Sequence, residues 1–93
     1  MKKQLHVYYS GRVQGIGFRY AVQEIAGSLK VSGWVKNLSD GRVEVLAEAE
    51  ESALSSFLEQ VNQRFSRYIK EVNAEWQPAG SQPGELHDFQ VSF

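Results

Sequence analysis

Apolar residues alternate with more polar ones along several short stretches of the chain and follow helical spacing along two longer ones. In residues 4–12, Leu5, Val7 and Tyr9 occupy every second position, which is the period of a strand with one buried face. From Phe18 onward the apolar residues recur at intervals of three and four. This spacing predicts a helix that ends near Lys30.

The rest of the chain repeats these two patterns. Residues 31–37 and 42–50 indicate two strands joined by a turn at "LSDG" (38–41), in which Gly41 can take a positive φ. Residues 51–66 return to helical spacing, with acidic residues at the start, where the helix dipole favours them. Residues 68–76 and 88–93 alternate again, on either side of a loop rich in Gly and Pro at 77–87.

The order of these elements, β-α-β-β-α-β plus a short last strand, predicts an α+β fold: an antiparallel sheet with two helices packed on one face. The first strand, its crossover helix and the second strand form a unit in which both strands run the same way, so their carboxyl ends lie at one edge of the sheet. The loop "GRVQGIGFR" (11–19) leaves the first strand at that edge, and Asn37 ends the second strand there.

The loop at 11–19 contains three glycines and two arginines. Gly11, Gly15 and Gly17 allow backbone conformations in which successive N–H groups point inward and form a nest for an anion, and the following helix adds its unpaired first-turn donors. Arg19 can lay its guanidinium beside the nest and make a two-point contact with a phosphate or carboxylate. The same loop could instead serve only as a tight turn, and Asn37 could be an ordinary strand-end residue.

Nucleotide-binding motifs do not fit the loop. It lacks the Gly-Lys-Ser/Thr ending of a P-loop, and "GIGFRY" lacks the third glycine of a dinucleotide motif. No cofactor is therefore indicated.

Length, charge and composition narrow the possibilities further. A chain of 93 residues predicts a single domain over residues 1–93. The net charge of −1 argues against a general nucleic-acid binder, yet residues 1–43 carry seven Lys or Arg against two acidic residues, and residues 44–93 carry three against nine. The N-terminus has no leader-like or membrane-spanning apolar run, which predicts a cytoplasmic protein with no membrane partner. A monomer is expected.

The usual catalytic groups are scarce. The chain has no cysteine, and its two histidines, His6 and His87, are interpreted as structural or solvated residues. Trp34 is interpreted as a packing residue, and Lys36 and Arg42 as solvated charges. No Ser-His-Asp order and no metal-ligand cluster can be assembled, so no metal site is expected. Hydrolysis of an already activated phosphate would suit such a chain, because charge stabilisation and a positioned water can suffice for it.

Two stretches of the chain, "GRVQGIGFR" (11–19) and "GWVKNLSDGRVEV" (33–45), resemble the two signatures of the acylphosphatase family in the expected order and spacing, and the likeness extends over nearly all of the sequence. The resemblance implies a ferredoxin-like α/β sandwich and the metal-independent hydrolysis of acyl phosphates, small-molecule substrates, to a carboxylate and inorganic phosphate. It implies that Arg19 binds the phosphate and that Asn37 orients the water. It also implies a cradle of backbone N–H groups from Gln14, Gly15, Ile16, Gly17 and Phe18.

The sequence departs from the family pattern at three positions. Ile16 stands where valine is usual, Tyr9 where an aliphatic residue is common, and Ala49 where glycine is usual, in a strand end expected to lie far from Arg19. None of these changes removes a reacting group.

Other functions on the same fold stay open at this point. The main alternative is a non-catalytic module that binds an anion or another small ligand. An RNA-binding sheet would show an RNP-like run of basic and aromatic residues, and none is present. A similar domain also heads the hydrogenase-maturation carbamoyltransferases, which are much longer chains.

Overall fold

The structure is a computed structural model that describes residues 1–81 and 88–92. Every predicted strand and helix is present in this part, and the ends that it describes lie within two residues of those expected. Predicted positions 82–87, His87 among them, and Phe93 lie outside the described residues. In chain order the elements are β1 (Lys2–Gly11), α1 (Phe18–Ser28), β2 (Ser32–Asn37), β3 (Val43–Glu50), α2 (Glu51–Arg64), β4 (Ile69–Pro78) and β5 (Gln90–Ser92).

The strands form one sheet in the order β4-β1-β3-β2-β5. Neighbouring strands among the first four are antiparallel, as predicted, whereas β5 pairs with β2 in parallel, so the sheet is mixed. The strands β4 and β5 occupy opposite edges of the sheet. Because β5 runs opposite to β4, and its neighbour β2 also runs opposite to β4, β5 and β2 are parallel.

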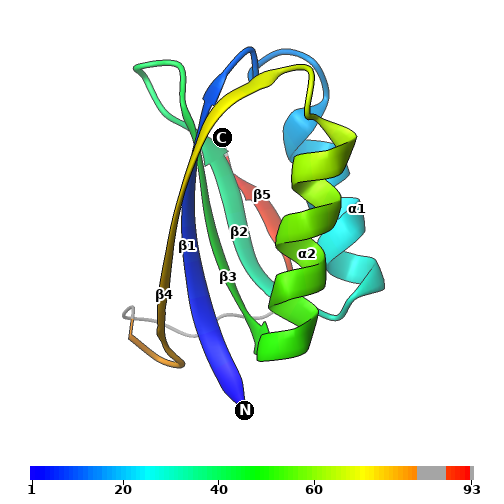
Figure 1. Ribbon diagram of the computed structural model, residues 1–93, viewed down its shortest axis with the longest axis vertical. Helices are drawn as coiled ribbons and strands as arrows, with labels where there is room; N and C mark the ends of the chain where they lie inside the picture. Colours follow the sequence, from blue (N-terminus) through cyan, green and yellow to red (C-terminus); the bar gives the residue numbers. More distant parts are fainter. Residues whose placement is uncertain (82–87, 93) are drawn as a thin grey trace.

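Both helices cover the same face of the sheet (Figure 1), which confirms the predicted two-layer α/β sandwich. Alternate residues of β1 point into the space between the layers because side chains of a strand alternate between its two faces. The interior is filled by fully buried residues of both layers, among them Leu5, Val7, Tyr9, Val22, Val35, Val45, Leu54, Phe57 and Val61. Neither helix in residues 1–81 and 88–92 has the length and hydropathy needed to cross a membrane.

The sheet places the ends of β1 and β2 side by side with one strand between them. Tyr9 and Asn37 both pair with Val43 of β3, so they lie at the same level of the sheet, about 10 Å apart at two strand spacings. Directly paired residues point to the same face, and Tyr9 points towards the helices. The side chain of Asn37 therefore also leaves the sheet on the helix-bearing face, as does the loop that follows β1 (Figure 1).

The other face of the sheet carries no helix in the described part and holds a polar and aromatic cluster. Glu44 accepts a hydrogen bond from the Tyr8 hydroxyl at 3.1 Å, and its carboxylate lies 2.6 Å from His6 Nε2. The Lys36 ammonium lies 3.7 Å from the same carboxylate and 5.0 Å from the centre of the Trp34 ring. His6 and Trp34 both pair with Leu46 of β3 and lie on this face, away from the helices. The interpretation of His6 as a structural or solvated residue and of Trp34 as a packing residue stays a prediction.

Candidate active site

The loop that follows β1 contains two glycines in the left-handed conformation. Gly15 has φ +76° and Gly17 has φ +79°, while Ile16 between them does not have a positive φ. A Cβ at either glycine would meet nothing within 4 Å, so the backbone conformation, not the available space, is what favours glycine here. Alternation of right- and left-handed residues turns successive N–H groups towards one side, which is the geometry of an anion-binding nest.

The loop ends at the amino terminus of α1, where the helix has no side-chain cap. Gly17 is the N-cap residue, and the first turn contains no acidic side chain. The first intrahelical bond of this turn runs from the Ala21 N–H to the Gly17 carbonyl at 3.1 Å. First-turn donors and the positive end of the helix dipole therefore face the same place as the glycine loop, and this combination favours an anion.

A hollow of about 170 Å³ lies at this junction of loop and helix. It is lined by Val13, Gly15, Gly17, Phe18, Arg19 and Tyr20, so the structure brings four of the predicted site residues together. Arg19 Nη1 donates a hydrogen bond to the Ser92 carbonyl at 3.0 Å. Since Ser92 pairs with Lys36, the neighbour of Asn37 in β2, this bond holds the guanidinium at the end of the sheet where β2 also ends.

Asn37 is the last residue of β2 and does not line the hollow. Its Oδ1 is buried and accepts no hydrogen bond from the described part of the chain. A buried acceptor without a donor costs about 1–3 kcal/mol, and such an atom in a polar setting marks a place for a water or a ligand.

The remaining predicted cradle residues have side chains that point elsewhere. Gln14 donates from Nε2 to the carbonyls of Leu38 and Arg42, each at 2.9 Å. Ile16 is about one-third exposed, at 36%, and neither it nor Gln14 lines the hollow. Any contribution of these two residues to a cradle would come from the backbone.

Phe18 belongs both to the hydrophobic core and to the start of α1 beside the hollow. Its ring is 1% exposed and packs edge-on against Tyr9, with ring centres 5.2 Å apart. Phe18 is also the first residue of α1 and one of the residues that line the hollow. The core thereby fixes the first turn of the helix, and Tyr9, which departs from the family pattern, packs directly beneath the loop. Ala49 pairs with Lys3 at the other end of β1, so the expectation that it lies far from Arg19 is confirmed.

Two contacts of this region were not predicted from the sequence: those of the Gln14 amide and that of Arg19 with the Ser92 carbonyl. A polar side chain inside a glycine-rich loop indicates that Gln14 needs hydrogen-bond partners, but which partners it finds depends on the turn at 38–42. The Ser92 carbonyl gives no signal at all, since a backbone oxygen is present at every residue.

Two titratable groups close to the site have shifted pKa values. Asp40 accepts hydrogen bonds from the Arg42 backbone N–H at 3.0 Å and from its Nε at 2.8 Å, and these bonds lower the pKa of the Asp40 carboxyl. Burial raises the pKa of the Tyr9 hydroxyl, which has no hydrogen-bond partner in the described residues. Arg42 is thus engaged with Asp40 and with the face of the Tyr8 ring, 4.8 Å away.

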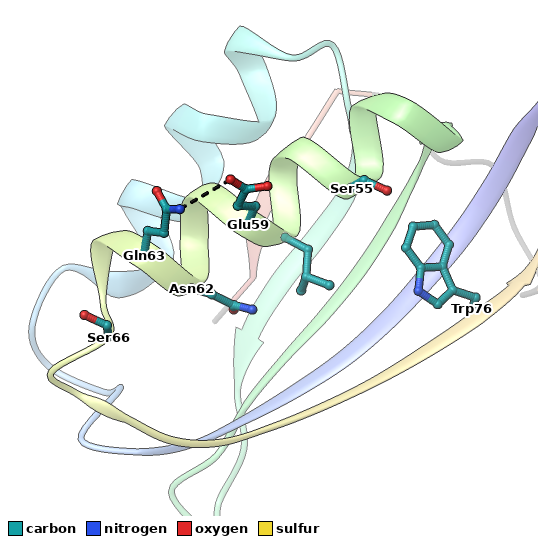
Figure 2. Close-up of a pocket in the computed structure, with 7 residues that line it drawn as sticks. Ser55, Glu59, Asn62, Gln63, Ser66 and Trp76 are labelled. Carbon is teal, nitrogen blue, oxygen red and sulfur yellow. Dashed lines mark hydrogen bonds between the residues drawn. The ribbon is translucent and has the colours of Figure 1, made fainter.

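A larger hollow, of about 480 Å³, lies between α2 and the edge strand β4. Figure 2 shows Trp76 of β4 facing α2 across this hollow, and Glu59, which accepts a hydrogen bond from Gln63 at 3.3 Å. Glu59 is the one charged group among its described lining residues, so these residues offer an anion no positive side chain. None of the predicted site residues lines this hollow. No group of three His, Cys, Asp or Glu side chains suited to a metal ion occurs within the described ranges.

The fold and the junction of loop and helix define a class of protein: a two-layer α/β sandwich with a glycine-containing loop and a hollow between its first strand and first helix. The sequence profile of the acylphosphatase family matches residues 5–91, and the chain belongs to that family.

Named relatives agree with this assignment. The chain is 59% identical to the acylphosphatase of Bacillus subtilis over 58 residues, which are 62% of this chain and 64% of the relative. The crystal structure of acylphosphatase from Bacillus subtilis superposes with a TM-score of 0.85 and 41% identity over the whole of both chains. An acylphosphatase from Coxiella burnetii superposes with a TM-score of 0.73 and 32% identity over 98% of this chain and 93% of that one. The sequence match with the curated relatives thus spans less than two thirds of their length.

Proposed function

We propose that this protein is an acylphosphatase that hydrolyses small acyl phosphates to a carboxylate and inorganic phosphate. In this proposal the phosphoryl group lies in the hollow at the start of α1. The backbone N–H groups of residues 14–18 and the guanidinium of Arg19 contact its oxygens, and Asn37 holds the attacking water. The site is built from one chain, so the proposal requires no second copy.

The reaction is a single displacement at phosphorus. The water oxygen forms a bond to phosphorus, the bond between phosphorus and the acyl oxygen breaks, and the electron pair leaves with the carboxylate. The proton of the water passes to a phosphoryl oxygen. Because a carboxylate is a weak base, with a conjugate acid of pKa about 4, its departure needs no general acid. The cradle and Arg19 stabilise the charge on the phosphoryl oxygens, so the proposal calls on no metal ion.

One observation carries the proposal: an uncapped helix start, preceded by two left-handed glycines, opens on a hollow that also has Arg19 in its wall. Donors fixed by backbone geometry need no reorganisation when charge develops on the phosphate, which is where electrostatic catalysis gains most.

The direct test follows the loss of acetyl phosphate in the presence of EDTA. We expect wild-type protein to hydrolyse it, and Arg19→Ala to lower kcat/KM by roughly 100- to 1,000-fold, the usual cost of a lost charge-stabilising donor. Arg64→Ala is the matched control, because Arg64 is an exposed arginine on α2 whose ion pair with Glu24 spans 3.8 Å.

Each outcome of this assay has a clear meaning. Wild-type rates in Arg19→Ala would contradict the proposed mechanism. A folded wild-type protein that binds inorganic phosphate but releases no product would favour the non-catalytic binding module instead.

A further inference from the structure

The side chain of Gln14 connects two parts of the molecule that are far apart in sequence. Its Nε2 donates to the Leu38 carbonyl and to the Arg42 carbonyl, each at 2.9 Å. These two residues close the turn between β2 and β3, since the Leu38 N–H donates to the same Arg42 carbonyl at 2.8 Å. The side-chain amide of Gln14 therefore donates both of its hydrogens to the two ends of a single turn.

This connection is important because the two halves of the proposed site belong to different secondary-structure elements. The cradle at 14–18 continues from β1 into α1, whereas Asn37 belongs to the hairpin of β2 and β3 and immediately precedes Leu38. Strand β3 lies between β1 and β2, so Asn37 is two strand spacings, about 10 Å, from Tyr9 of β1. Gln14 bridges this gap with a short side chain that lies half-buried.

We infer that Gln14 is a positioning residue for hydrolysis: its side-chain amide fixes the phosphate cradle relative to Asn37 and so sets the distance between phosphorus and the attacking water. This inference rests on the proposed function. It assigns to Gln14 a role distinct from that of its backbone N–H. A displacement of about 1 Å between reacting groups can lower the rate by roughly 100-fold. Hydrogen bonds that fix the distance between the loop and the hairpin therefore favour a high rate.

Two substitutions separate the bridge from the cradle. Gln14→Ala removes the bridge, and Gln14→Glu keeps the size of the side chain but presents acceptor oxygens to two carbonyl oxygens. Both leave the backbone N–H groups of the loop in place. We expect kcat to fall about 10- to 100-fold, more in Gln14→Glu than in Gln14→Ala, while the inhibition constant of inorganic phosphate changes by less than about 3-fold.

A double-substitution cycle with Asn37→Ala identifies the residue through which Gln14 acts. If the bridge serves to place the water held by Asn37, then Gln14→Ala lowers kcat by less than about 3-fold once Asn37 is already alanine, because coupled positions are not additive. A general structural defect would lower kcat by the same factor in both backgrounds.

Gln4→Ala is the matched control for lost glutamine hydrogen bonds. Gln4 is 1% exposed and donates from Nε2 to Glu48 at 3.1 Å, near the opposite end of β1 from the loop. We expect this variant to lose stability and to keep the kcat of the wild type. All variants are assayed well below their melting temperatures, which are measured alongside.

A second readout does not depend on turnover. When inorganic phosphate is titrated into labelled wild-type protein, the NMR signals of the Leu38 amide and of the Asn37 side chain shift together with those of the loop, and in Gln14→Ala the loop signals shift alone. Wild-type kcat in Gln14→Ala, an equal loss in both backgrounds of the cycle, or an unchanged shift at Asn37 in Gln14→Ala overturns the inference.

The inference and the proposed function fail in different ways. A wild-type protein that hydrolyses acetyl phosphate while Gln14→Ala matches it refutes the role of Gln14 alone. If the wild-type protein does not hydrolyse acetyl phosphate, but phosphate shifts the Leu38 and Asn37 signals and this effect is lost in Gln14→Ala, the proposed function is refuted. The positioning role of the Gln14 side chain between loop and turn then stands. Phosphate that moves no signal in the wild type contradicts both.

Discussion

Asn37 ends in a buried oxygen that accepts no hydrogen bond from the described part of the chain. If that oxygen holds the attacking water, Asn37→Ala lowers kcat by about 100-fold, because the water is no longer oriented, and changes KM by only a few-fold, because the phosphate contacts stay. Steady-state kinetics with acetyl phosphate measures both constants. Asn73→Ala is the control, since Asn73 is exposed on the edge strand β4. A raised KM with unchanged kcat would assign Asn37 to substrate binding instead.

Near the loop, the hydroxyl of Tyr9 is a second buried group that has no hydrogen-bond partner in residues 1–81 and 88–92. Its ring packs against Phe18 and is fully buried, so the hydroxyl lost its hydrogen bonds to water on folding and regained none in the described residues. Tyr9→Phe keeps the ring and removes this cost. We expect the free energy of unfolding to rise by about 1–2 kcal/mol, measured by urea denaturation.

Tyr20→Phe provides the comparison for Tyr9→Phe. Tyr20 is 57% exposed, so the loss of its hydroxyl should change the free energy of unfolding by no more than about 0.5 kcal/mol. A loss of stability in Tyr9→Phe would show that the hydroxyl has a hydrogen-bond partner, and would contradict the expectation that the buried hydroxyl lowers the free energy of unfolding.

At the scale of single residues, the sequence predicts backbone roles better than side-chain contacts. The left-handed conformations of Gly15 and Gly17 follow from residue type, because glycine in a loop before a helix carries little steric cost there. The hydrogen bonds of Gln14 and the anchoring of Arg19 on Ser92 depend on tertiary neighbours 24 to 73 residues away. No local sequence pattern can predict contacts between residues so far apart along the chain.

At the scale of elements, the turn between β2 and β3 has a stability that depends on pH. The two hydrogen bonds from Arg42 lower the pKa of the Asp40 carboxyl below its ordinary value of 3.8. A carboxyl whose pKa is lower in the folded state stabilises the fold above the unfolded value, and this contribution disappears as the pH falls through the folded value.

The prediction for the turn concerns Asp40→Asn. The wild type should exceed this variant in free energy of unfolding at neutral pH, and the difference should shrink below pH 3.8 as Asp40 takes up its proton. Urea denaturation of both proteins at a series of pH values measures it. A difference that stays constant down to the most acidic pH would mean that the Asp40 charge does not stabilise the turn.

Most elements were predictable because each has one buried face and a clear period. The buried positions of α1, such as Phe18, Val22 and Ile25, recur at intervals of three and four, and most of those of β1 recur at intervals of two. The parallel pairing of β5 with β2 was not predictable in the same way. A strand of three residues has too short a pattern to show which neighbour it pairs with or in which direction, and both are fixed by its place at the edge of the sheet next to β2.

For the whole molecule, the topology brings together the residues of the candidate site, which lie far apart in the sequence. Two strands running the same way bring the glycine loop and Asn37 to one end of the sheet, and β5 brings the Ser92 carbonyl to Arg19. The amino-terminal half, which carries most of the basic residues, supplies the loop, α1 and β2. This distribution suits an anionic substrate even though the net charge is −1.

An NMR titration of labelled wild-type protein with inorganic phosphate, the product of the proposed reaction, is the direct check on whether phosphate binds at the start of α1. We expect saturable shifts that are largest at the backbone amides of residues 14–18 and at the Arg19 guanidinium, and that are strongly weakened in Arg19→Ala. Shifts centred on the hollow between α2 and Trp76, or no saturable shift at any concentration, would contradict this expectation.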